Sequence, residues 1–197
     1  MKEFSLIMAL VDYIPVILFI LAMFILINNL RNKIDIINKI ILYFGITLVS
    51  LAGFFKATYK LLYSLNIGDY IWMSNQFFTN QALGFLLVGI GILMFISKKN
   101  KKINSFIPTM GLVFIMIVGL AAMDAGLCYI ANKMKKRNAL ICFIISFFLC
   151  LMMGYLSSRN FDKALINWIA QGINILGQLL LFIGIKILDQ ANLKEYI

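Results

Sequence analysis

Amide side chains recur on one face of the last apolar segment of this sequence, where they could bind a polar solute. The four amides are spaced four, three and four residues apart, so a helix would place them in one stripe. An amide can both donate and accept hydrogen bonds, so such a stripe could coordinate a zwitterion, a sugar, a cation or a file of water. The alternative is that these amides only bond neighbouring helices, at roughly 0.6–2 kcal/mol each. They are Asn167, Gln171, Asn174 and Gln178.

An earlier apolar segment carries a matching set of amides near its start. Gln76, Asn80 and Gln81 precede Gly84 and Gly91, glycines that would let two helices approach closely. We expect Gln81 and Asn174 to face each other near the centre of the bilayer. A solute path between the third and sixth segments follows from this expectation.

Four charged residues lie within apolar sequence and form the second group of candidates. Asp12 and Asp124 are the deepest acids, and Lys56 and Lys60, one helical turn apart, are their expected partners. In the functional interpretation one of the two carboxylates titrates and couples a proton or cation to transport. In the other, the charges sit at the interface depth and the lysines extend to the headgroups.

Composition places these residues in a membrane protein. Of the 197 residues 62% are hydrophobic and 13% charged, and the mean hydropathy is +0.95. There is no histidine, and the three cysteines show no C-x-x-C spacing, so we expect neither a metal site nor a disulfide framework nor a cofactor. Catalytic and nucleotide-binding motifs are also missing from the sequence, and we do not expect an enzyme.

The net charge of +10 comes from basic residues that lie mostly between the apolar runs. There they anchor helix ends at anionic headgroups, so the expected partner is the lipid bilayer and not a nucleic acid. A small solute or ion, a second copy of the chain or a partner subunit could bind as well. The expected location is a prokaryotic plasma membrane, which the chain would cross several times.

Six apolar segments have the length of a membrane crossing, for which about 20 residues are needed. Because lipid offers no hydrogen bonds to the backbone, these continuous runs predict helices, and we expect one all-α membrane domain over residues 1–197. The segments are Phe4 to Asn28, Ile36 to Tyr63, Asn75 to Ile96, Ser105 to Ala131, Asn138 to Ser157 and Asp162 to Leu188.

An internal repeat is indicated at a shift of 93 residues. Residues 81–92 match residues 174–185 at seven of twelve positions, and Ile14-Pro15 falls on Ile107-Pro108. Repeats over residues 1–97 and 98–197, with three crossings each, would be inverted relative to each other. Such a relation would explain why Lys and Arg divide nine to nine between the two faces and leave the orientation open. The alternative is a coincidence between two glycine-bearing apolar helices.

Three classes of function remain open from the sequence. The first is a transporter or channel for a small solute or ion, with its path at the midplane between the third and sixth segments. The second is a non-catalytic binding or assembly subunit that docks a partner protein. The third is an intramembrane enzyme that modifies lipids, with Asp12 or Asp124 acting without histidine.

Overall fold

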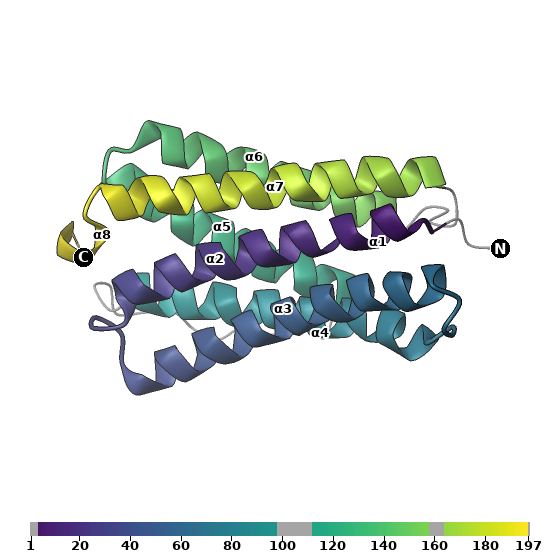
Figure 1. Ribbon diagram of the computed structural model, residues 1–197. Coiled ribbons are helices and arrows are strands. Elements are labelled where there is room, and N and C mark those ends of the chain that lie inside the picture. Colours follow the sequence, from purple (N-terminus) through teal and green to yellow (C-terminus); the bar gives the residue numbers. More distant parts are fainter. Residues whose placement is uncertain (1–3, 98–111, 158–163, 197) are drawn as a thin grey trace.

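The computed structural model describes residues 4–97, 112–157 and 164–196, and the regular structure in these ranges is α-helical. The long helices form a bundle around one axis (Figure 1). Five of the described spans are long and apolar enough to cross a membrane, and Arg137–Met153 is a shorter apolar stretch. The expected all-α, multi-pass bundle is therefore confirmed. Its helices are α1 (Leu6–Val11), α2 (Tyr13–Leu30), α3 (Ile36–Ser64), α4 (Ile71–Ser97), α5 (Leu112–Lys133), α6 (Arg137–Ser157), α7 (Ala164–Gln190) and α8 (Leu193–Tyr196).

The first membrane span is interrupted at Asp12, between α1 and α2. Pro15 accounts for the break, because it has no N–H to donate to the carbonyl of Val11 and its ring crowds that carbonyl. The Ser5 hydroxyl accepts a hydrogen bond from the Met8 N–H at 3.2 Å and caps the start of α1. The interruption places the carboxylate of Asp12 inside the span.

The directions of α4 and α5 contradict the inverted relation expected between the two halves. Gly89 of α4 packs against Gly119 of α5. Farther along both helices, Ile92 of α4 packs against Gly126 of α5. Residue numbers at these contacts rise along both helices in the same direction, so the two helices run parallel. The second half therefore starts from the same end of the bundle as the first, and the prediction of inverted repeats is wrong.

The α2–α7 pair leads to the same conclusion on the other side of the bundle. Gln171 near the start of α7 bonds the Met8 carbonyl in α1, while Asp189 at the end of α7 bonds Asn29 at the end of α2. These helices also run parallel. The N- and C-terminal ends consequently lie at opposite ends of the bundle (Figure 1), and not on one side as six alternating crossings would require.

Corresponding contacts nevertheless support a relation between the halves. A shift of 93 residues relates two glycines of α4 to two glycines of α7, and a shift of 101 residues relates their partners on α3 to those on α6. Such a repeat would be parallel, with its axis along the bundle. The corresponding contacts are Gly84–Val49 with Gly177–Cys150, and Gly91–Leu42 with Gly184–Phe143. Pro108, part of the match proposed from the sequence, lies outside the described residues.

The helix α3 is longer than its counterpart α6, with 29 residues against 21. At the shift of 101 residues, Ser157 at the end of α6 corresponds to Lys56. The last two turns of α3, Ala57 to Ser64, correspond at this shift to residues 158–165, which lie mostly outside the described residues. These turns contain Lys60.

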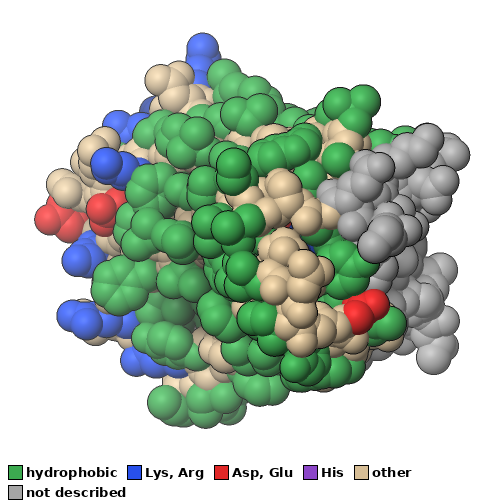
Figure 2. Space-filling view, turned by 45° about the vertical axis from the view of Figure 1, so that its right-hand side comes forward, with side chains coloured by type: hydrophobic (Ala, Val, Ile, Leu, Met, Phe, Trp, Pro, Cys, Tyr) green, Lys and Arg blue, Asp and Glu red, His purple; other side chains and the backbone are tan. Residues whose placement is uncertain are grey.

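Most of the basic side chains among the described residues gather at one end of the bundle. This basic end is formed by the α2–α3 turn, the α5–α6 turn and the end of α7. Among the described residues, only Lys56 and Lys60 lie toward the other end. Lys and Arg lie at the left of Figure 2, beside a broad apolar surface. By the positive-inside rule we expect the basic end to face the cytoplasm. It carries Arg31, Lys33, Lys39, Lys133, Lys135, Lys136, Arg137, Lys186 and Lys194.

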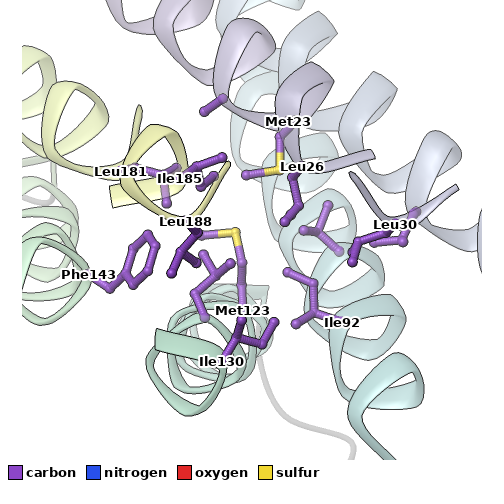
Figure 3. Packing of buried hydrophobic residues seen from close by; sticks show 14 of the residues in the cluster. Met23, Leu26, Leu30, Ile92, Met123, Ile130, Phe143, Leu181, Ile185 and Leu188 are labelled. Carbon is purple, nitrogen blue, oxygen red and sulfur yellow. The ribbon is translucent and has the colours of Figure 1, made fainter. Parts of the chain in front are cut away.

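A cluster of buried apolar side chains fills the half of the bundle nearer the basic end. Side chains of α2, α4, α5, α6 and α7 converge there (Figure 3). Burying one such side chain contributes about 1.5–3 kcal/mol when it leaves water, although lipid is itself apolar and close packing then supplies the attraction. Members of this apolar cluster include Leu30, Ile92, Ile130, Phe143 and Leu188.

Candidate functional site

An ion pair is buried near the end of the bundle opposite the basic end. The Nζ atom of Lys60 lies 2.6 Å from Oδ2 of Asp12, and the two side chains are 3% and 12% exposed. Lys60 also donates a hydrogen bond to Oδ1 of Asn167 at 3.2 Å. The pairing of Lys60 with an acid, expected from the sequence, is present with Asp12.

Three elements hold this ion pair. The α1–α2 interruption supplies Asp12, the last two turns of α3 supply Lys60, and the first turn of α7 supplies Asn167. Gln171, one turn farther along α7, donates a hydrogen bond from Nε2 to the carbonyl of Met8 at 2.8 Å. We refer to Asp12, Lys60, Asn167 and Gln171 as the ion-pair cluster. It joins the first half of the chain to the second.

A cavity of about 40 Å³ lies next to the ion-pair cluster along α7. Three amides line it: Gln81 comes from α4, whereas Asn174 and Gln178 come from α7. Both halves of the chain thus supply polar groups to one cavity, which we call the amide cavity. Its remaining lining is Phe77, Phe78, Phe85, Met116, Leu120, Cys150 and Met153.

The amide cavity retains unused hydrogen-bonding capacity. Gln178 is only 7% exposed, and its Oε1 atom has no hydrogen-bond partner among the described residues. At the residue directly before Gln178, Ser146 of α6 donates a hydrogen bond to the carbonyl of Gly177 at 3.0 Å. A buried amide oxygen without a partner is costly, and a ligand that donates or coordinates would remove that cost.

The size of the amide cavity limits what it can hold in this conformation. A water molecule needs roughly 10–15 Å³ of such space, so about 40 Å³ accommodates a few waters or one small ion with a water. A larger solute would enter only if the helices around the cavity moved apart.

The structure divides the predicted amides among three environments. Gln81, Asn174 and Gln178 line the amide cavity, so the expectation that Gln81 and Asn174 face a common space agrees with the geometry. Asn167 and Gln171 instead belong to the ion-pair cluster. The remaining two do not line the cavity: Gln76 is exposed and Asn80 is half-buried. The amides of the stripe therefore do not share one environment.

The two remaining charged candidates also differ in their placement. Lys56 lies over the ring of Phe77, with Nζ 3.9 Å from the ring centroid, a geometry typical of a cation–π contact. Asp124 is 3% exposed, and its oxygens form no hydrogen bond or ion pair with a described residue. The expectation that Asp124 pairs with Lys56 or Lys60 is wrong, because it lies on α5, nine residues before the basic end of that helix.

Some groups of the ion-pair cluster and of the amide cavity were not predicted from the sequence. The Met8 carbonyl accepts a hydrogen bond from Gln171 although Met8 lies within α1. The only feature of the sequence near Met8 that pointed to an irregular helix was Pro15. Cys150 and Phe85 line the amide cavity, but an apolar residue in an apolar run gives no sign of the space beside it.

Within the described ranges, no three His, Cys, Asp or Glu side chains gather where they could hold a metal ion, and the three cysteines are free thiols. In comparisons with known proteins, no protein-family model, no curated protein and no solved structure matches this chain significantly. Functional inference therefore depends on the geometry described above.

Proposed function

We propose that the protein is a small membrane transporter or channel whose solute path passes through the amide cavity. The observation that carries this proposal is the lining of one cavity by amides from α4 and α7, at related places in the two halves. Transporters built from repeats bind their substrates where the repeats meet. A subunit that only docked a partner would have no use for polar groups around an internal space.

The order of features along α7 supports the same proposal. From the start of α7, its buried face passes through the ion-pair cluster at Asn167 and Gln171, then the amide cavity at Asn174 and Gln178. The apolar cluster follows, beginning at Leu181. Along α7 the cavity thus lies between the ion-pair cluster and the apolar cluster. In this proposal a solute reaches the cavity by passing one of these two clusters.

Transport can be tested with purified protein in lipid vesicles. The probes are ²²Na⁺, ⁸⁶Rb⁺, glycine and glycerol, which represent the cations, zwitterions and neutral solutes that amides can bind. We expect at least one probe to enter faster than in vesicles without protein, and Gln178→Leu to lower that rate about tenfold or more, equivalent to at least about 1.4 kcal/mol.

Gln76→Leu is the matched control, because it makes the same change at an exposed amide outside the cavity. Its rate should equal that of the unmodified protein. Entry of all four probes at the rate of protein-free vesicles, or equal losses in both leucine variants, would contradict the proposed path.

A further inference from the structure

Asp124 is a buried acid that the ion-pair cluster does not use. It lies on α5, 12 residues after Leu112 and nine before Lys133, so it is roughly 13 Å from the basic end of that helix. Its side chain is 3% exposed, and neither carboxylate oxygen has a hydrogen-bond partner among the described residues. A carboxylate in such surroundings is very costly unless a proton or a cation balances its charge.

Two neighbours place Asp124 beside the amide cavity. Leu120, one helical turn before it on α5, lines the cavity. Cys150 of α6 also lines the cavity. Gln178 of α7 lines it as well, and its Oε1 atom is buried without a partner among the described residues. Asp124 thus lies one helical turn beyond a cavity-lining residue of α5, beside a cavity that α6 and α7 also line.

None of the described basic side chains pairs with Asp124. Lys60 is engaged with Asp12, and Lys56 lies over Phe77 near the same end of the bundle. The other described basic residues are at the basic end. Near Asp124 the described titratable groups are the thiols of Cys128, one turn along α5, and Cys150. Thiols do not supply positive charge, so the charge of Asp124 is left for a proton or a bound cation to balance.

We propose that the end of the amide cavity next to Asp124 binds a monovalent alkali cation. The Asp124 carboxylate supplies the one negative charge, and Oε1 of Gln178 supplies a neutral oxygen ligand. A divalent ion is disfavoured because calcium and magnesium sites in proteins generally combine several oxygen ligands, commonly with more than one carboxylate. This inference rests on the proposed function in placing the cation on the transport path, but binding itself can be measured without transport.

The test is the melting temperature of the purified full-length protein in detergent at constant ionic strength. Choline chloride is replaced stepwise by NaCl or by KCl. A ligand that binds only the folded protein stabilises it as its concentration rises, so we expect at least one alkali chloride to raise the melting temperature by several degrees over choline. Asp124→Asn, which keeps the shape of the side chain, should remove this cation-dependent rise.

Glu195→Gln is the control, because it removes an exposed acid in α8, away from the cavity. It should retain the cation-dependent rise. The proposal is overturned if the unmodified protein melts alike in all three salts, or if Asp124→Asn retains the rise. A rise that Asp124→Asn abolishes, in a protein that passes none of the four flux probes, would support the cation site while removing the transport function.

Discussion

Replacing Lys60 by methionine is expected to lower the free energy of unfolding by about 3–5 kcal/mol. The lysine is 3% exposed and lies 2.6 Å from Asp12, so its removal leaves a buried carboxylate without its counter-charge. The loss also removes the hydrogen bond to Asn167 that connects the two halves of the chain. Thermal or denaturant unfolding of the purified protein in detergent measures the effect.

The double variant Asp12→Leu with Lys60→Met tests whether the loss comes from the unpaired charge. Removing both charges should restore much of the stability, since apolar replacements of a buried ion pair are often neutral. Lys194→Met is the control at an exposed position and should change stability by no more than about 0.5 kcal/mol. If Lys60→Met costs no more than this control, the ion pair is not buried in the folded protein.

Gly119→Ala is expected to destabilise the protein by about 3 kcal/mol, the upper part of the range for an overpacked interior. A Cβ atom at this position would overlap the backbone of Leu86, so α4 and α5 would have to separate. Backbone atoms cannot avoid the overlap by changing rotamer, as a side chain could. The unfolding free energy in detergent is again the measurement.

Gly172→Ala makes the same change where nothing lies within 4 Å of the added atom. It should stabilise the protein by about 0.5–1 kcal/mol, because alanine favours a helix over glycine. Similar effects from the two substitutions would show that α4 and α5 do not meet at Gly119, and would contradict the parallel packing of these helices at that position.

The helices and part of their packing could be predicted from the sequence. Continuous apolar runs of crossing length leave the backbone no alternative in lipid, so five of the spans were identified within a few residues. Where both bounds lie in the described residues, the largest difference is at α4, which begins at Ile71 and not at Asn75. The start expected at Ser105 lies outside the described residues. Gly84 marks a close helix approach, as expected, but its neighbour is α3 and not the sixth segment, and Gly177 likewise packs on α6.

The directions of the helices could not be predicted. A count of basic residues by face assumes that successive segments cross alternately, and under that assumption Lys and Arg divided equally. The parallel packing of α4 and α5 depends on which faces fit together, as at Gly89 and Gly119. Nothing in the local pattern of either helix specifies its partner's direction.

The amide stripe of α7 shows the same limit on a smaller scale. Its spacing places Asn167 and Gln178 on one face of the helix, as the structure confirms by burying both. The neighbours differ with depth, however, because α7 meets Lys60 at its start and the cavity near its middle. Spacing predicts the face of a helix but not what lies opposite at each turn.

The most direct test of the central claim is whether water reaches the amide cavity in the membrane. Cys150 lines that cavity, and replacing Cys128 and Cys142 by alanine leaves it as the single thiol. A charged, membrane-impermeant methanethiosulfonate reagent is then applied outside intact cells. Ile67→Cys in a cysteine-free background, in the exposed α3–α4 turn, is the positive control for the expected orientation.

We predict that Cys150 reacts with the external reagent, more slowly than the cysteine at position 67, because the ion-pair cluster must open to admit the reagent. Failure of the position-67 cysteine to react before the cells are opened would contradict the orientation. A Cys150 thiol that stays unmodified from either side of the membrane, while the position-67 cysteine reacts fully, would contradict a path through the amide cavity for a solute as large as the reagent.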